Sequence, residues 1–435
     1  MNLQQIKALF IQAGVVKLFG KLLAENDNSK NQVYFGPGFQ ALNLFPNEGI
    51  VPDSSATHPI FKAKLRFGWL QPNGGVAPAP GAQLILYPQY PEVRFSGFLK
   101  GCADPPSKLM AARIAGRILL LGVTADRRVI GFVAAASSEI ASEFESLHPS
   151  PQTGVIFSLG LPLIPDETNS RAKLLAELRR ISALGWISSK QLDSEGTLKP
   201  CVASHCGGLT LEAELGISKN SIADPDYLGW EVKQHTVTNF FRAYSAAPIT
   251  LMTPEPTGGF YKTQGVEAFI RKFGYPDKNG KPDRFNFGGV HRTGARQAST
   301  GLELRLVGYD SVRGKITDSG GSVVLVNDAG EVAAAWEFNG LLGHWSHKHS
   351  LAVYVPAMRR MRPTRQYAYG ARVRLAQRTD PLRFLAALAS GSVYYDPGIK
   401  LENASSKPVV KRRSQFRIAS KHIAELYNSL DEVDV

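Results

Sequence analysis

The chain has 435 residues, of which 43% are hydrophobic and 20% are charged, a composition typical of globular proteins and a length sufficient for two domains. Its 50 Lys and Arg residues outnumber its 37 Asp and Glu residues, and the formal net charge of +13 suits a polyanionic partner. No apolar run approaches the length of a membrane span, and the amphipathic amino terminus lacks a signal-peptide cleavage pattern, so we expect no membrane association. The odd number of cysteines, three, indicates a reducing cytoplasm.

Residues 1–150 are predicted to form a mostly β domain. An amphipathic stretch opens it, a helix-like segment covers residues 39–45, and a closing helix is expected over residues 139–147. Strands are expected at residues 60–69, 83–87, 92–99, 117–124 and 129–135, the last two joined by a hairpin turn at residues 125–128. Short strands separated by turns rich in Gly and Pro predict a barrel or a sandwich.

Two runs of this domain carry a family resemblance. The run KLLAENDNSKNQVYFGPGFQALNLFP and the later run AQLILYPQYPEVRFSGF resemble the EcoRII-type amino-terminal effector domain, a DNA-binding pseudobarrel of the plant B-three type. The resemblance implies two arms in the major groove, where such side chains reach base edges and phosphates. The candidate DNA contacts are Lys21, Asn26, Asp27, Asn28, Lys30 and Gln32 on the first arm and Arg94, Ser96 and Lys100 on the second. The alternative for residues 26–29 is a simple polar turn.

Residues 151–168 are predicted as a linker, and residues 169–435 as a second, α/β domain. The segment 148–154 has linker composition, whereas the apolar residues 155–164 are expected to pack against one of the domains. Leucine and isoleucine then recur at helical spacing from Leu174 to Leu184.

The candidate catalytic motif is Asp226-x₄-Glu231-x-Lys233. Residues 229–237 have the aromatic and β-branched content of a strand, so Glu231 and Lys233 share a face, and a bend can return Asp226 to that face. Two carboxylates suit Mg²⁺, and a lysine beside them can orient an attacking water and offset phosphate charge. The pattern alone is common, and a solvated strand edge is the alternative.

The residues around this motif resemble the catalytic domain of the MvaI/BcnI restriction endonucleases, which are PD-(D/E)xK nucleases related to MutH. The resemblance rests on GWIxSK and on the run GGLTLEAELGISKNSIADPDYLGWEVKQH. It implies an α/β core with a central mixed sheet flanked by helices, metal binding by Asp226 and Glu231, and a further carboxylate, Glu212, facing the metal site. A surface helix acid is the alternative for Glu212. Residues 249–252 and 300–308 are predicted as further strands of the core sheet.

Later segments supply candidate DNA contacts. The run LLGHWSHKHSLAVYVPAMRR is a further point of resemblance, and its histidines lack the partners of a complete zinc site. Cys201 and Cys206 are interpreted as ordinary thiols, and residues 430–435 as a solvated acidic tail. The candidate contacts are His347, Lys348, His349, Arg359, Arg362, Arg412, Arg413, Gln415 and Arg417, with a solvated basic face as the alternative for the arginines.

Together these observations predict a Mg²⁺-dependent type II restriction endonuclease that cleaves double-stranded DNA at a short pseudopalindromic site. The order of the two resemblances is similar to that of UbaLAI-like enzymes, which implies a CCWGG-like target, two DNA sites per chain and a monomer. Two alternatives remain: a MutH-like repair nuclease that nicks DNA, and a DNA-binding regulator with an inert nuclease fold.

Overall fold

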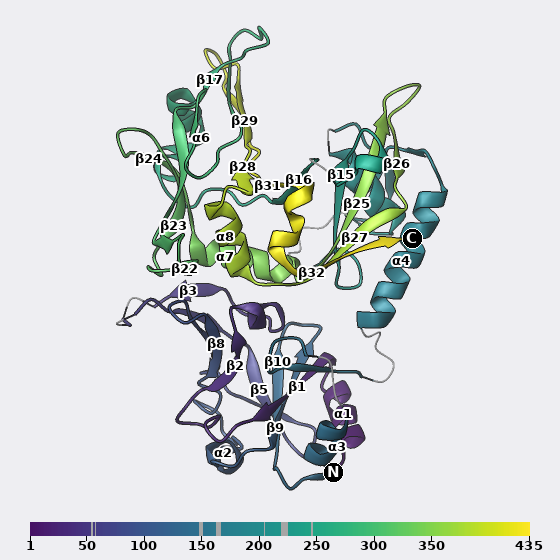
Figure 1. Cartoon of the computed structure of the whole chain (residues 1–435), viewed down its shortest axis with the longest axis vertical. Coiled ribbons are helices and arrows are strands. Elements are labelled where there is room, and N and C mark those ends of the chain that lie inside the picture. The colour runs from purple at the N-terminus through teal and green to yellow at the C-terminus, as the bar shows by residue number, and fades with distance from the viewer. Residues whose placement is uncertain are drawn as a thin grey trace. The chain divides into compact units, whose positions relative to one another are not determined.

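A computed structural model describes residues 1–53, 55–56, 58–147, 151–161, 167–203, 205–218, 225–244 and 247–435. The chain divides into two compact units, Met1–Ser170 and Arg171–Val435. Each unit has its own sheets and its own hydrophobic core (Figure 1).

The first unit is built from two sheets of short strands. The six-stranded sheet has the order β11 (Phe157–Leu159), β1 (Val15–Leu23), β9 (Arg117–Thr124), β10 (Val129–Ala134), β5 (Phe67–Leu70), β6 (Val76–Pro78). The five-stranded sheet has the order β2 (Val33–Pro37), β8 (Glu92–Ser96), β7 (Gln83–Tyr87), β4 (Phe61–Lys64), β3 (Ile50–Pro52). The helices are α1 (Leu3–Gln12), η1 (Gln40–Asn43), α2 (Ser107–Ala111) and α3 (Glu139–Ser146).

The strand predictions for this unit are confirmed, with one break. The expected strand at residues 60–69 is two strands, β4 and β5, which lie in different sheets. The hairpin between β9 and β10 forms as predicted, with Arg127 in the left-handed region at φ 66°. Part of the predicted linker forms β11, which pairs with β1. Closure of the two sheets into a pseudobarrel stays a prediction.

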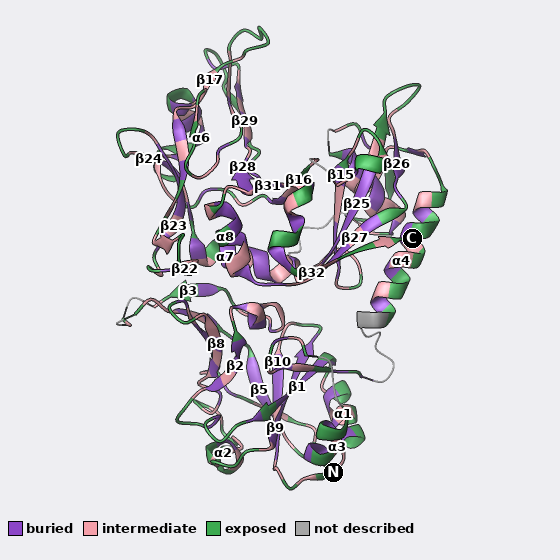
Figure 2. Ribbon diagram, in the orientation of Figure 1, coloured by how far each residue is buried: buried purple, intermediate pink, exposed green. Residues whose placement is uncertain are grey.

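The second unit is organised around a mixed sheet, as predicted. Its order is β12 (Ile187–Ser188), β26 (Gln366–Tyr369), β25 (Leu351–Arg360), β27 (Arg372–Thr379), β32 (Tyr427–Asp434), and β15 (Glu231–Thr236) runs parallel to β25. Strand β25 is buried over most of its length (Figure 2), as a central strand must be. Helices α4 (Glu167–Ala183) and α5 (Cys206–Glu214) contribute Leu174, Leu178 and Leu211 to the core beneath Val232 and Val353.

Smaller sheets complete the second unit. A three-stranded sheet has the order β16 (Pro248–Met252), β31 (Phe416–Ala419), β28 (Val393–Tyr395), and one four-stranded sheet has the order β17 (Tyr275–Pro276), β18 (Arg284–Gly288), β29 (Gly398–Glu402), β30 (Val409–Lys411). The other four-stranded sheet has the order β19 (Arg296–Gln297), β20 (Leu302–Val307), β23 (Ser322–Val326), β24 (Val332–Glu337). Two pairs of strands complete the set: β13 (Lys190–Leu192) with β14 (Leu198–Pro200), and β21 (Tyr309–Asp310) with β22 (Lys315–Ile316). The remaining helices are η2 (Phe240–Arg242), α6 (Phe260–Phe273), α7 (Phe338–Lys348), α8 (Pro381–Ala389) and η3 (Ser420–Leu426).

Three predictions about this unit are wrong. Strands β16 and β20 exist, but they belong to separate sheets rather than to the core sheet, because their partners are β31 and β23. The acidic carboxyl end is not a solvated tail: it is β32, an edge strand of the core sheet. Ion pairs from Arg372 to Asp434 and from Arg374 to Glu432, both at 3.0 Å, bring opposite charges together across this pair of strands.

Candidate active site

Strand β15 separates core residues from candidate catalytic residues. Val232 packs into the core with Trp230, and their side chains are 6% and 0% exposed. Because side chains alternate along a strand, Glu231 and Lys233 lie on the opposite face. Their shared face is confirmed by an ion pair of 2.5 Å between Lys233 Nζ and Glu231 Oε1.

A tight hairpin brings Asp226 to the start of this strand. Tyr227 and Trp230 exchange two backbone hydrogen bonds, of 2.9 and 2.8 Å, around the two-residue turn Leu228–Gly229. The carboxylate of Asp226 then accepts a hydrogen bond of 2.9 Å from the backbone N–H of Val232. The hairpin is therefore the bend that was predicted to return Asp226 to the strand, and the hydrogen bond to Val232 holds the carboxylate there.

The three acids differ in their electrostatic surroundings. Burial, followed by the negative charge of Asp226, raises the pKa of Glu212 to about 7. Burial, followed by the charge of Glu231, also raises the pKa of Asp226. Because each of these pKa values depends on a neighbouring acid, Glu212 of helix α5 and Asp226 of the hairpin belong to one electrostatic cluster with Glu231.

Glu231 and Lys233 behave as a pair. Burial opposes ionisation of Glu231, but the positive charge of Lys233 and of its other cationic neighbours outweighs burial and lowers the pKa of Glu231. The pKa of Lys233 is raised, because the charge of Glu231 outweighs the effect of burial. At neutral pH both groups are therefore charged.

The carboxylates offer a partial ligand set for a hard cation. The second oxygen of Glu231, Oε2, is buried and accepts no hydrogen bond from the described residues. Within the described part of the chain, no three His, Cys, Asp or Glu side chains already converge as a metal site. A buried oxygen with spare lone pairs, together with Asp226, fits Mg²⁺, which is commonly held by one or two carboxylates and completes its shell with water and phosphate oxygens.

The end of helix α7 adds a second lysine. Lys348 Nζ lies 3.8 Å from Glu231 Oε2, so an ammonium group flanks each oxygen of this carboxylate. Lys348 was predicted only as a candidate DNA contact. Its spacing of four residues from His344, whose pKa is lowered by burial and then by Lys348, is the sequence signal that both project from one helix face.

His349 is a structural residue, so its prediction as a DNA contact is wrong. Its side chain is fully buried and stacks on Trp345, with ring centroids 4.0 Å apart. Its two ring nitrogens lie 3.2 Å from the backbone carbonyls of Trp345 and Leu251. Burial, followed by the charge of Lys233, lowers the pKa of His349 to about 3, so the ring is neutral beneath the Glu231–Lys233 pair.

Three predicted contacts on the first arm are also buried, which corrects their assignment. Lys21 and Asp27 form an ion pair of 3.0 Å, and Asp27 accepts hydrogen bonds from the backbone of Ala24 and Tyr34. Asn28 accepts two further backbone N–H groups. These side chains hold the loop together. The other candidates in this unit are at least partly exposed: Asn26, Lys30, Gln32, Arg94, Ser96 and Lys100.

The late arginine segments divide in the same way. Arg359, Arg362, Arg412 and Arg413 are exposed, whereas Gln415 is buried at 5% exposure, so its assignment as a base contact is wrong. Arg417 is half-buried and its guanidinium lies 2.6 Å from Asp396. His347 is partly exposed.

Cys201 and Cys206 are joined by a disulfide, so their interpretation as ordinary thiols is wrong. The bond closes a short loop directly before helix α5, the element that carries Glu212. Cys102 is a free, partly exposed cysteine.

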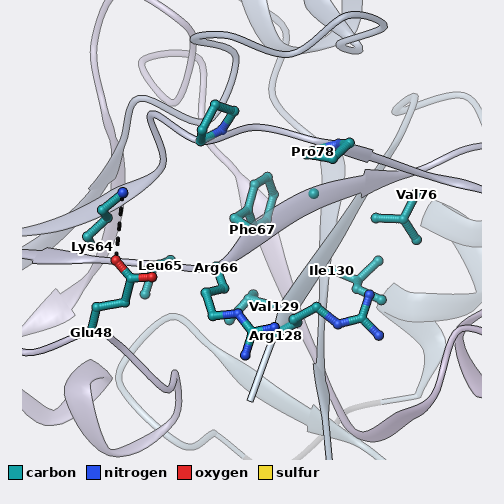
Figure 3. A pocket seen from close by; sticks show the side chains of 12 residues that line it. Glu48, Lys64, Leu65, Arg66, Phe67, Val76, Pro78, Arg128, Val129 and Ile130 are labelled. Atoms are coloured by element: carbon teal, nitrogen blue, oxygen red, sulfur yellow. Dashed lines mark ion pairs between the residues drawn. The ribbon is translucent and has the colours of Figure 1, made fainter. Parts of the chain in front are cut away.

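A hollow of about 310 Å³ lies in the first unit, and its lining includes none of the predicted DNA contacts (Figure 3). Its floor is apolar and includes Phe67 and Ile130, and its rim carries Lys64, Arg66 and Arg128. Lys64 pairs with Glu48, and the two arginines share Asp126. The hollow holds no constellation of catalytic residues.

The sequence comparison identifies the family. Residues 175–427 match the model of the MvaI/BcnI restriction endonuclease family. Because this segment is more than half of the 435 residues, the chain belongs to the MvaI/BcnI restriction endonuclease family. It is therefore a member of a family of DNA-cleaving nucleases, which confirms the resemblance predicted for the second domain.

Solved structures give weaker likenesses. The restriction endonuclease MvaI in complex with its cognate DNA substrate is 16% identical, covers 60% of this chain and 97% of its own, and has a TM-score of 0.45. The B3 domain of the UbaLAI restriction endonuclease with cognate DNA is 20% identical, covers 35% of this chain and 95% of its own, and has a TM-score of 0.23. Both TM-scores lie below 0.5, so family membership follows from the sequence match alone. A comparison with curated proteins finds no match. In the described part of the chain, no helix is long and apolar enough to cross a membrane.

Proposed function

We propose that this chain is a Mg²⁺-dependent type II restriction endonuclease that cleaves double-stranded DNA at a short pseudopalindromic site, with a CCWGG-like pentanucleotide as the first candidate. The observation that carries the proposal is the cluster of Asp226, Glu231 and Lys233 at β15 in a chain of a restriction endonuclease family. Glu212 joins the same electrostatic cluster from helix α5.

Each residue has a role in this proposal. Asp226 and Glu231 would hold Mg²⁺, whose charge makes water a stronger nucleophile and offsets negative charge on the phosphate. Lys233 orients the attacking water and donates hydrogen bonds to the phosphate oxygens. The hydrogen bond from Val232 fixes the direction of the Asp226 carboxylate, and Lys348 offsets the charge of Glu231.

The first unit is proposed as a separate DNA-binding effector domain. Its exposed candidates Asn26, Lys30 and Lys100, and the partly exposed Arg94, are side chains of types that reach bases and phosphates in other proteins. The chain would then carry two DNA sites and act as a cytoplasmic monomer, since a single active site suits an asymmetric reading of a pseudopalindrome.

Removal of either key side chain tests the proposal. Asp226→Ala and Lys233→Ala should abolish cleavage of plasmid DNA in Mg²⁺ while duplex binding stays within a few-fold of wild type, because neither change removes an exposed arginine. Asp328→Ala, at an exposed acid of the same unit, is the matched control. Cleavage at the wild-type rate by either variant contradicts the proposal.

The same assay separates the two alternatives. Preferential nicking of mismatched or hemimethylated duplexes would favour a MutH-like repair nuclease. An absence of nicking on every DNA tested, with and without Mg²⁺, would favour a DNA-binding regulator. Cleavage ends mapped by sequencing on phage DNA would give the recognition site directly.

A further inference from the structure

A fully exposed aromatic residue follows the catalytic strand. Phe241, in η2, has a relative exposure of 102%, the highest among the exposed large hydrophobic side chains of the described residues. It lies eight residues after Lys233, beyond the carboxyl end of β15. Single exposed hydrophobic side chains are common on protein surfaces, but burying a phenylalanine is strongly favourable in water, so the ring of Phe241 is available to an apolar partner.

The residue before Phe241 is anchored. The ring of Phe240 lies against Gly370, where an added Cβ would approach a ring carbon to 2.8 Å. Asn239 caps the turn by accepting a hydrogen bond of 3.0 Å from the backbone N–H of Arg242. The turn is therefore fixed to the core sheet on the amino-terminal side of Phe241.

The residues after Phe241 are anchored as well. Ala243 is buried, and its carbonyl lies 3.1 Å from Nε2 of His235 on β15. The hydroxyl of Tyr244 donates a hydrogen bond of 2.8 Å to the carbonyl of Tyr354 on β25, and the guanidinium of Arg374 lies 4.0 Å from the centre of the Tyr244 ring. With both flanks fixed to the sheet, exposure of Phe241 is a property of a rigid turn.

We propose that Phe241 is a stacking wedge that inserts its ring between, or against, base pairs of the duplex bound for cleavage. The proposal rests on the proposed function and adds a DNA contact that none of the candidate residues supplies. Apolar side chains that enter a base step unstack it and kink the duplex, and aromatic rings stack on bases irrespective of sequence. The adjacent Arg242 is exposed, and its positive charge suits the phosphates on either side of such a step.

Phe241 lies close enough to the candidate catalytic residues to influence the DNA strand that is cleaved. Eight residues separate Lys233 from Phe241 and strand β15 ends after the first three, so at about 3.3 Å per extended residue Phe241 lies at most about 26 Å from Lys233. Base pairs rise about 3.4 Å each, so the ring lies within about eight base pairs of a phosphate bound at Lys233. A kink at this distance would orient the backbone toward Asp226 and Lys233, which makes Phe241 a positioning residue.

The test uses the full chain with an Asp226→Ala change, so that DNA is bound without being cut. The probe is a duplex of about 25 base pairs with one CCAGG sequence and 2-aminopurine at successive positions in and around it. We expect 2-aminopurine fluorescence to rise at one position on binding, because the base there loses its stacking partner. Adding Phe241→Ala should abolish the rise and weaken duplex binding about ten-fold, whereas Phe241→Trp should retain both.

Val312→Ala is the matched control, since Val312 is an apolar side chain of the same unit with 95% exposure; it should change neither fluorescence nor affinity. Equal fluorescence and affinity with and without Phe241→Ala would overturn the wedge. A wild-type chain that cuts no DNA would instead overturn the proposed function, so the two failures are distinguishable.

Discussion

Glu212 shows how position decides the chemistry of a carboxyl group. Glu231 has two lysines beside it and a lowered pKa, whereas Glu212 has the negative charge of Asp226 as its strongest charged neighbour and a pKa raised to about 7. At neutral pH without a cation, Glu212 is therefore partly protonated. A divalent cation at the cluster would favour its ionised form, because opposite charge lowers the pKa of a carboxyl group.

The pH dependence of the free energy of unfolding, measured without metal, tests the raised pKa of Glu212. The folded chain binds more protons at Glu212 than the unfolded chain between pH 4.5 and about 7, so its contribution to the free energy of unfolding falls as pH rises through that window. Glu212→Gln removes this loss. We expect urea denaturation with a chelator to show that the free energy of unfolding of the variant, relative to that of wild type, is about 1–3 kcal/mol higher at pH 8 than at pH 5. An equal difference at the two pH values would contradict the raised pKa.

At the scale of elements, the hairpin before β15 is what brings Asp226 close to Glu231 and Lys233. Its two turn residues both have positive φ, 47° at Leu228 and 87° at Gly229, as a two-residue hairpin of the type I′ class requires. Glycine adopts this conformation freely, but leucine in the left-handed region is strained. The hydrogen bonds across this turn, and not the strain in it, hold Asp226 beside the start of β15.

Relief of that strain should stabilise the chain without changing cleavage. Leu228 is 45% exposed, so Leu228→Asn loses little buried area, and asparagine tolerates positive φ. We expect the free energy of unfolding to rise by about 0.5–1 kcal/mol at an unchanged cleavage rate. Gly229→Ala is the opposite control and should cost about 1 kcal/mol and slow cleavage, because the turn that holds Asp226 is forced to shift. Destabilisation by Leu228→Asn would show that the turn carries no strain.

The elements also show where sequence reasoning succeeds. Alternation along β15 places Glu231 and Lys233 together, and the helical spacing from Leu174 to Leu184 marks α4, since these are local patterns. Pairing between distant segments is not local: the acidic carboxyl end becomes β32 by pairing with β27, and Arg372 and Arg374 of that strand lie opposite its acidic residues. The ion pair of Lys21 with Asp27 and the disulfide between Cys201 and Cys206 join residues that are close in sequence, but no periodic pattern of side chains marks either contact.

At the scale of the whole molecule, the formal charge of +13 acts through the cations that remain exposed. Arg412 and Arg413 in the second unit and Lys30 in the first unit are exposed, whereas Lys21 is neutralised in a buried pair. Each phosphate contact made by an exposed cation releases condensed counterions, so the logarithm of the affinity falls with the logarithm of the salt concentration, with a slope of about −0.9 per contact. The slope therefore counts the cations that touch DNA.

The salt dependence of duplex binding should decide which units share one DNA molecule. Measured with an Asp226→Ala chain, the combined changes Arg412→Ala and Arg413→Ala should reduce the magnitude of the slope by about 2, and Lys30→Ala should reduce it by about 1 if the first unit holds the same duplex. Arg296→Ala, at an exposed arginine already paired with Asp328 at 3.0 Å, should leave the slope unchanged. A slope altered only by the arginine changes would assign the measured site to the second unit alone, and a slope altered by none of them would remove these residues from the DNA interface.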